Sequence, residues 1–196
     1  MKSFPALPAA IAATLFLSSC TSPATDEHAG QDQATSTSSS AVQPAAFNDA
    51  DVAFATNMIP HHQQAVEMSA MVPDRSTDPA VVKLAADISA AQGPEIETMK
   101  AFLVQWNAGG SEHQGHGDMA MDGMVDQAAM TKLQSLEGAE FDTLWLQSMI
   151  GHHEGAIKMA QAELAGGANA DAKTLAQQIV TGQQAEIVQM KQMLGW

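Results

Sequence analysis

The sequence has a single cysteine, no tyrosine and few aromatic residues, which make up 5% of its 196 positions. One cysteine cannot form an internal disulfide, and it also excludes zinc sites built from several thiolates. Positive charge is scarce, because 8 Lys and Arg stand against 22 Asp and Glu, which gives a formal net charge of -14. An acidic protein of this kind repels nucleic-acid backbones and anionic lipid headgroups. We therefore expect no nucleic-acid partner, and cations are the favoured partners.

Methionine and histidine are abundant instead, with 13 Met and 7 His. Imidazole binds Cu, Zn, Ni and Fe, and the thioether of methionine favours Cu(I) over hard cations. A metal site in this chain would therefore use histidine, methionine and carboxylate ligands. The length of the chain is enough for one ordinary domain.

The N-terminal segment has the features of an export signal. An apolar stretch too short to span a membrane follows Lys2, and Leu17-Ser18-Ser19-Cys20 resembles the bacterial lipobox, in which cleavage precedes a lipidated cysteine. We expect a signal peptide over residues 1–19 and an exported protein anchored in the bacterial cell envelope by a lipid on Cys20 alone. An ordinary signal peptide with an incidental cysteine is the alternative. Residues 20–47, rich in Ser, Thr, Ala, Gln and Pro, are expected to form a flexible tether.

The rest of the chain contains an internal repeat at a constant offset. Met58-Ile59-Pro60-His61-His62 aligns with Met149-Ile150-Gly151-His152-His153, and a later stretch around Glu95 aligns with one around Glu186. Because the offset holds across two elements and their turn, the repeat predicts a duplicated helical hairpin. On the first helix of each hairpin the matching positions share one face. Four positions that differ are expected on the outer face: Pro60, Gln63, Gln64 and Glu67, aligned with Gly151, Glu154, Gly155 and Lys158.

Periodicity and helix-capping residues predict helices near residues 49–71, 79–107, 139–165 and 170–195, with a shorter helix near 126–137. Asn48 or Asp49 is expected to cap the first helix, and Pro94 is expected to kink the second or break its ladder. We expect an all-α, ferritin-like four-helix bundle over residues 48–196, built from hairpins 48–107 and 139–196 and a long connection over 108–138. The order of the hairpins in space stays open, and with it whether the two His pairs form one site or two.

The paired histidines are the leading metal ligands. They fall on the inner face of their helices, and a methionine three or four residues earlier shares that face. Copper is the expected metal, with Cu(I) favoured and silver as its mimic. The alternatives are hydrogen-bonded core histidines and methionines that only fill the core. The candidate ligands are His61, His62, His152, His153, Met58, Met149, Glu95, Glu186, Met99 and Met190.

The two glutamates have three roles open to them. Each could bind the metal, accept a hydrogen bond that orients an imidazole, or be a buried acid held by Gln92 or Gln183. For a hairpin that turns near residue 75, helix lengths at 1.5 Å per residue allow Glu95 to miss His61 by more than a turn. Glu95 and Met99 could then form a separate level that faces Asp51, and the kink expected at Pro94 leaves this register open. Asp51 could instead be a first-turn acid that interacts favourably with the helix dipole.

The connection contains a second candidate metal segment. Two histidines and three methionines within twelve Gly-rich residues resemble the Met/His-rich segments of exported copper and silver binders, on composition alone. These positions are His113, His116, Met119, Met121 and Met124.

Two copies of Met-Ile-x-His-His-x-x-Ala-x-x-Met and the later Gln-x-x-Glu-Ile-x-x-Met-Lys resemble the family known as domain of unknown function 305. The resemblance covers about residues 47–196 and implies a ferritin-like bundle. It also implies the copper binding and resistance of some exported members. The ligands it implies are Met58, His61, His62, Glu95 and Met99, with their partners Met149, His152, His153, Glu186 and Met190. Pro60 departs from the expected pattern, because a helix interior rarely holds proline.

These observations predict a non-catalytic copper-binding protein of the cell envelope that sequesters or carries copper, with a copper chaperone or efflux protein as a candidate partner. A ferritin-like dimetal carboxylate enzyme is the first alternative. Such enzymes use a Glu-x-x-His motif, and neither Glu95 nor Glu186 is followed by His at that spacing. A metal-free structural or interaction module is the second alternative.

Overall fold

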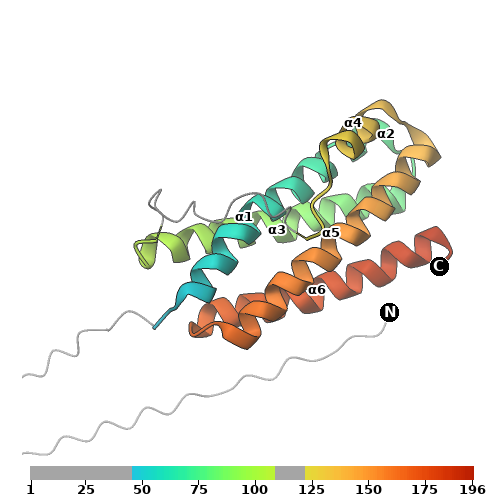
Figure 1. The fold of residues 1–196 in the computed structure, drawn as a ribbon. Coiled ribbons are helices and arrows are strands. Elements are labelled where there is room, and N and C mark those ends of the chain that lie inside the picture. The colour runs from blue at the N-terminus through green and yellow to red at the C-terminus, as the bar shows by residue number, and fades with distance from the viewer. Residues whose placement is uncertain (1–45, 109–121) are drawn as a thin grey trace, which may run out of the picture. The chain divides into compact units, whose positions relative to one another are not determined.

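The computed structural model describes residues 46–108 and 122–196, and these residues form helices without any strand (Figure 1). The expected all-α class is confirmed. Each predicted helix has an observed counterpart, and one further helical turn lies between the first two. The helices are α1 (Asp49–Ala70), α2 (Val72–Arg75), α3 (Pro79–Gln105), α4 (Gln127–Ser135), α5 (Gly138–Gly166) and α6 (Ala170–Leu194).

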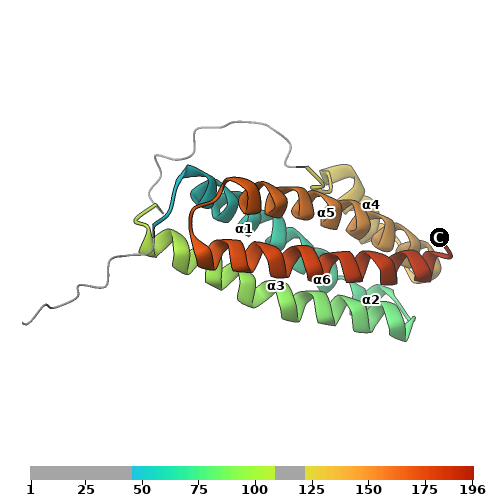
Figure 2. The same ribbon diagram turned by 90° about the horizontal axis from the view of Figure 1, so that it is seen from below.

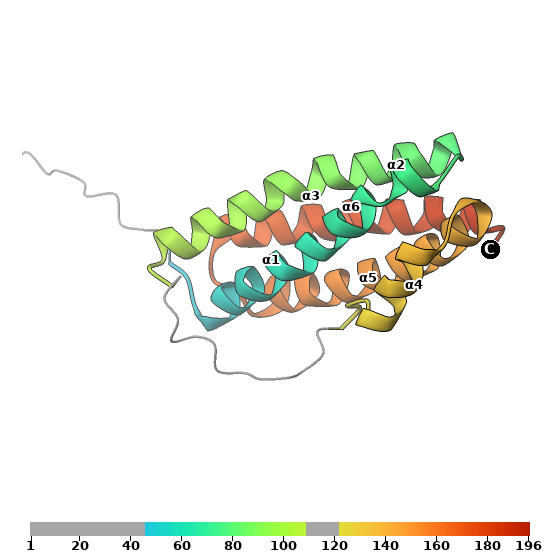
Figure 3. The ribbon, with the colours of Figure 1, turned by 90° about the horizontal axis from the view of Figure 1, so that it is seen from above.

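The helices pack as a bundle of two hairpins. One hairpin pairs α1 with α3, the other pairs α5 with α6, and α1 packs against α5 between them. Figures 2 and 3 view the bundle from opposite sides, and in both views α6 lies between α3 and α5. The α1–α5 contact includes the indole of buried Trp145, which donates to the Met68 carbonyl at 3.0 Å. The inner faces of α1 and α5 therefore form the middle of the core.

The ends of the helices follow the capping residues. The Asn48 side chain accepts hydrogen bonds from the backbone N–H groups of Ala50 and Asp51, while the Asp51 carboxylate accepts from the Asn48 N–H. This reciprocal capping satisfies donors that have no partner within the helix. The Asp78 side chain caps α3 by accepting from the Ala80 N–H, and Pro79 occupies the first position of the helix, where its missing N–H needs no partner.

Two prolines lie inside helices without ending them. Pro60 lies within α1 and Pro94 within α3. Each proline lacks the N–H that would bond to the carbonyl four residues earlier, so each helix loses one rung of its ladder. The departure at Pro60 from the repeated motif is therefore accommodated in a continuous helix.

Glu95 does not form the separate level that the helix lengths left open. That level assumes a first helical arm that ends near residue 71. The extra turn of α2 extends the helical arm to Arg75, so the path from His62 is about 20 Å long and the path from Pro79 to Glu95 is about 24 Å. The difference is less than one turn, and Glu95 lies beside His62.

The end of the predicted tether packs on the bundle. The Ala46 carbonyl accepts a hydrogen bond from the Asn169 side chain, and the Phe47 ring stacks on Trp106 with ring centroids 5.3 Å apart.

None of the helices in the described ranges combines the length and the apolar character that crossing a bilayer requires.

Candidate metal centre

The four paired histidines meet at the centre of the α1–α5 contact. All four are 0% exposed. His61 and His152, which align in the sequence repeat, have ring centroids 3.7 Å apart with a 37° tilt, and the centroids of His152 and His153 are 6.4 Å apart. The two hairpins therefore bring their histidines into one cluster, which we call the histidine cluster.

Each glutamate accepts a hydrogen bond from a histidine of its own hairpin. His62 Nε2 lies 2.8 Å from Glu95 Oε2, and His153 Nε2 lies 2.6 Å from Glu186 Oε2. Because a carboxylate oxygen accepts, Nε2 of each ring donates, and in a neutral ring Nδ1 then carries the lone pair. Of the three roles left open by the sequence, the orienting acceptor is the one that the geometry displays. Gln92 and Gln183 do not bond to these glutamates; their amide atoms are buried without a partner in the described structure.

The two touching histidines differ in their hydrogen bonds. His61 Nε2 lies 3.3 Å from the Asp122 carbonyl oxygen, to which it donates. Across the described ranges, the Nδ1 atoms of His61, His62 and His153 have no partner, and His152 has none at either ring nitrogen. Buried polar atoms normally find a partner. Five unpartnered nitrogens in one cluster are therefore an unusual concentration of free lone pairs and N–H groups.

Burial keeps the central imidazoles neutral. It lowers the pKa of His61 to about 4, helped by the neighbouring His62. It lowers the pKa of His152 to about 2, and again the adjacent imidazoles contribute. Neutral imidazole is the form that binds metals.

The predicted methionine ligands are all buried. Met58 and Met149 lie one turn before the histidines of α1 and α5, and Met99 and Met190 lie one turn after the glutamates. All four are 0% exposed and belong to the hydrophobic core. This burial fits a thioether ligand and a core residue equally.

Carboxylates and imidazoles alone do not complete a ligand set here. Within residues 46–108 and 122–196, no three side chains drawn from His, Cys, Asp and Glu form a group that could hold a metal ion. The buried thioethers of Met58, Met149, Met99 and Met190 are further candidate donors beside the imidazoles. That mixed donor set suits soft ions such as Cu(I).

A short segment that includes the end of the second candidate metal segment crosses this centre. Residues Asp122–Val125, which we call the crossing segment, precede α4 in the connection between the hairpins. Gln64 of α1 holds it through two bonds of 2.8 Å, one from the Val125 N–H and one to the Val125 carbonyl. Lys158 of α5 pairs with the Asp122 carboxylate at 3.0 Å.

The crossing segment corrects our assignment of the outer face. Gln64 and Gly155 were expected to point away from functional contacts. Gly155 is buried instead, because the crossing segment lies directly against it. A Cβ at this position would overlap the Asp122 carbonyl oxygen. The aligned positions 64 and 155 thus differ because one segment contacts them in two different ways. A glycine facing outward on a helix next to a histidine pair was the available sequence signal.

The second candidate metal segment is described only at its end. Met124 is half-buried within the crossing segment. His113, His116, Met119 and Met121 lie outside the described residues, as do Cys20 and the expected signal peptide.

Asp51 does not face Glu95, contrary to our expectation. It is 0% exposed and accepts bonds from the backbone N–H groups of Asn48, Ala168 and Asn169. Burial alone would raise its pKa, but these donors outweigh it and lower the pKa below its ordinary value. Asp51 therefore ties the start of α1 to the loop between α5 and α6.

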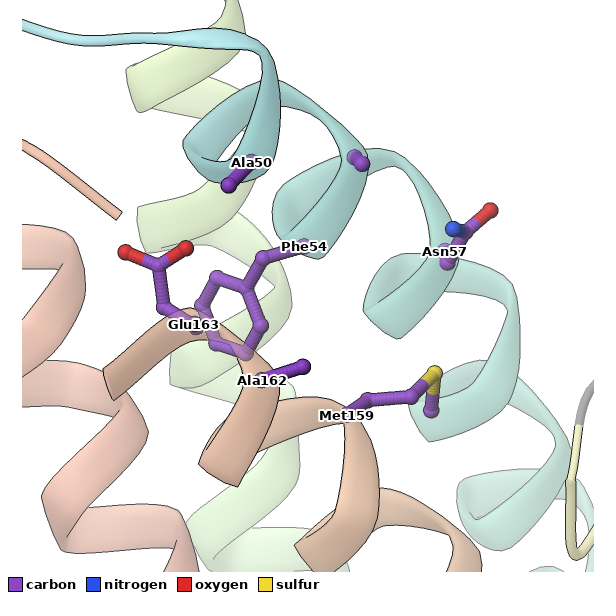
Figure 4. Close-up of a pocket in the computed structure, with 7 residues that line it drawn as sticks. Ala50, Phe54, Asn57, Met159, Ala162 and Glu163 are labelled. Carbon is purple, nitrogen blue, oxygen red and sulfur yellow. The ribbon is translucent and has the colours of Figure 1, made fainter. Parts of the chain in front are cut away.

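Beside Asp51 lies a second buried carboxyl group, Glu163, in the wall of a pocket of about 200 Å³ (Figure 4). Glu163 is 1% exposed, and neither carboxylate oxygen has a hydrogen-bond donor in the part of the chain described. Burial, followed by the proximity of Asp51, raises its pKa to about 7. The pocket is lined by Ala50, Ala53, Phe54, Asn57, Met159, Ala162 and Glu163.

Comparison with known proteins gives one family and several similar structures. The model of the family described as domain of unknown function (DUF305) matches residues 51–194. A DUF305 protein of Streptomyces coelicolor, described as secreted, is 36% identical, with a TM-score of 0.69 over 74% of this chain and 92% of that one. A DUF305 fragment from Deinococcus radiodurans is 33% identical, with a TM-score of 0.69 over 78% and 99%.

The protein CopM in its Cu(II)-bound form is 35% identical, with a TM-score of 0.60 over 73% of this chain and 94% of that one. Structures of CopM bound to Cu(I) and to Ag are similar as well. An uncharacterized protein of Acanthamoeba polyphaga mimivirus is 40% identical over 63 residues, which span 32% of this chain and only 41% of the viral protein.

Proposed function

Since this chain belongs to the DUF305 family, we propose that it is a copper-binding protein that sequesters or carries Cu(I) and Cu(II), with Ag as a mimic, and so contributes to metal tolerance. CopM, a similar protein in sequence and fold, has been solved with Cu(I), Cu(II) and Ag. The role is one of binding and carriage, without a catalytic step.

The observation that carries the proposal is the set of unpartnered ring nitrogens in the histidine cluster. Leaving buried polar atoms unsatisfied costs about 1–3 kcal/mol each in typical cases. A protein that only needed a packed core would lower that cost with apolar side chains. A metal ion that accepts these lone pairs would offset it, which supports metal binding as the reason for the cluster.

The geometry suggests a role for each candidate ligand. Nδ1 would be the metal-binding nitrogen of His62 and His153, because Nε2 of each is engaged by a glutamate. Glu95 and Glu186 would act as acceptors that orient these rings, an arrangement that raises the basicity of the ligating nitrogen. The thioethers of Met58, Met149, Met99 and Met190 would complete the donor set from the helical turns above and below.

We further propose that the protein is exported and lipid-anchored through Cys20, and that its two hairpins arose by duplication. The lipobox-like sequence before Cys20 supports the anchor. The equal 33-residue separations of the two His–Glu pairs support the duplication. Replacing Cys20 by Ala should abolish incorporation of labelled fatty acid; labelling that persists would contradict the anchor.

The deciding experiment is an anaerobic Cu(I) competition titration against a chromophoric chelator. It compares the wild-type chain with a variant in which His61, His62, His152 and His153 are Ala. A His113→Ala/His116→Ala variant is the matched control, since it removes histidines from the other candidate segment. Circular dichroism checks that each variant remains helical.

We expect tight binding by the wild type and by the control, and loss of binding in the helical four-histidine variant. Equal binding by all three proteins would exclude the histidine cluster as the main site and point to methionine-only positions. Loss in the control alone would assign the metal to the second segment. No binding by any of them would leave the structural module as the function.

A further inference from the structure

The crossing segment Asp122–Val125 makes the two halves of the histidine cluster unequal. It contacts α1 through His61 and Gln64, and α5 through Lys158 and the backbone around Gly155. His61 and His152 occupy aligned positions in the repeat, yet only His61 donates to a backbone carbonyl of this segment. A single segment crosses the contact between the hairpins, so it can serve only one of the two rings.

Two glycines allow the segment to lie this close. Gly123 has φ of +86°, a conformation that residues with a Cβ rarely adopt, and a Cβ there would come within 2.6 Å of the Gly151 carbonyl oxygen. At Gly155 a Cβ would overlap the Asp122 carbonyl, the same oxygen that accepts from His61. Gly151, one turn earlier on α5, has open space at its Cβ position.

We propose that the crossing segment is a positioning element for the metal centre: the Asp122 carbonyl holds His61 as the Nε2–H tautomer and thereby presents Nδ1 to the metal. A carbonyl oxygen can only accept, so the ring must keep its proton on Nε2 to make the bond. With this contact, His61 offers the same nitrogen as His62 and His153, which glutamates hold in the same tautomer. Gln64 and Gly155 act indirectly, by keeping the Asp122 carbonyl in place.

The inference rests on the proposed metal-binding function, but the tautomer can be read without metal. Long-range ¹H–¹⁵N spectra of the metal-free full chain, labelled at histidine, distinguish protonated from unprotonated ring nitrogens. A His61→Gln variant assigns the His61 signals. The test variants are Gly155→Ala, which displaces Asp122, and Gln64→Ala, which releases Val125. Their matched controls are Gly151→Ala and Gln63→Ala; Gln63 is the exposed neighbour of Gln64.

We expect His61 to have an unprotonated Nδ1 and a protonated Nε2 in the wild type and in both controls. In Gly155→Ala and Gln64→Ala the His61 signals should move toward a mixture of tautomers, while the signals of His62 and His153 stay unchanged. If His61 keeps its wild-type signals in a folded Gly155→Ala protein, the proposal is overturned. Should Gly155→Ala fail to fold, the same comparison of Gln64→Ala with Gln63→Ala decides.

A second measurement connects the tautomer to metal binding. Competition titration with Ag(I) should give an affinity about 10 to 100 times lower in the two test variants than in their controls, the usual effect of losing a partner that orients a ligand. Unchanged affinity together with an altered tautomer would overturn the positioning role while leaving the copper-binding function intact. Absence of Ag(I) and Cu(I) binding in the wild type would instead refute the proposed function, and the spectra would still report on the tautomer.

Discussion

His152 is the residue in which stability and the proposed metal binding conflict most directly. It is 0% exposed, and its two ring nitrogens lack partners among the residues described. His152→Leu should therefore leave the metal-free protein as stable as the wild type or raise its free energy of unfolding by about 1 kcal/mol, because an unsatisfied buried polar group is removed. The same variant should bind Ag(I) more weakly.

Urea unfolding with and without Ag(I) measures both effects. The matched comparison is His153→Leu, which leaves Glu186 without the ring that donates to it and should destabilise the metal-free protein. Equal destabilisation by the two substitutions would show that His152 is an ordinary core residue.

Glu163 should make the stability of the protein fall as the pH rises. Its pKa is raised from 4.5 to about 7 by burial and by Asp51, with Lys173 acting weakly in the opposite sense. A raised carboxyl pKa means that the folded state prefers the protonated form. Its contribution is complete below pH 4.5 and is lost as the pH increases through 7.

Relative to the wild type, Glu163→Gln should therefore gain about 1 to 3 kcal/mol in unfolding free energy between pH 5 and pH 8. Unfolding curves at the two pH values give this difference directly. Glu97→Gln, which changes a glutamate side chain that is 72% exposed, is the control and should show no such gain. A pH-independent difference for Glu163→Gln would contradict the assignment.

At the scale of the helices, Asn48 joins two hairpins at one point. Its side chain caps α1 and also donates to the Gly166 carbonyl at the end of α5, at 2.8 Å. Asn48→Ala should lower the free energy of unfolding by about 1 to 2 kcal/mol, since a cap and a tertiary bond are lost together. Thermal or urea unfolding measures the change. Asn57→Ala, the same substitution at an exposed position in the middle of α1, should change it far less.

The helices were largely predictable from sequence because their determinants are local. Apolar periodicity and caps such as Asp78 act within a few residues, and the observed helix limits lie close to those predicted. The extra turn α2 was not predicted from the sequence, because the backbone conformation at Pro73, just after α1, decides whether this turn forms. Because α2 lengthens the first arm of the hairpin by one turn, Glu95 lies beside His62. Leaving that turn out puts Glu95 at a different level of the hairpin.

At the scale of the whole molecule, the sequence repeat predicted two similar hairpins but not how they meet. Contact between His61 and His152 results from tertiary packing, which no local pattern encodes. The contact between His61 and the Asp122 carbonyl could not be predicted from the sequence either. Every residue has a backbone carbonyl, so the residue type gives no sign of which carbonyl makes such a contact. The repeat did predict which four histidines face inward, and all four are 0% exposed.

A metal bound at the histidine cluster should stabilise the entire bundle, because the cluster contains residues from both hairpins. At a free ion concentration 1,000 times the dissociation constant, the expected gain is about 4 kcal/mol. For a protein of this size, that corresponds to an increase in Tm of about 8 to 16 °C.

Calorimetry with Ag(I), and with Mg²⁺ as the hard-ion control, tests this expectation. No shift with Mg²⁺ is expected, because thioether and imidazole are poor ligands for it. A similar Ag(I)-induced rise in the variant without the four histidines would place the stabilising ion elsewhere.

The indole of Trp145 gives the protein an intrinsic optical reporter of whether its hairpins are docked. The ring is fully buried between α1 and α5, bonded to the Met68 carbonyl, and the chain has no tyrosine to add competing emission. Trp196, by contrast, is 67% exposed and already emits from water, and the third tryptophan, Trp106, is buried beside Phe47 and Phe102, so a Trp106→Phe variant leaves Trp145 as the buried emitter. Separation of the hairpins would move the Trp145 emission toward longer wavelength while the Trp196 emission stayed constant, so opening of the bundle can be followed in real time without any attached dye.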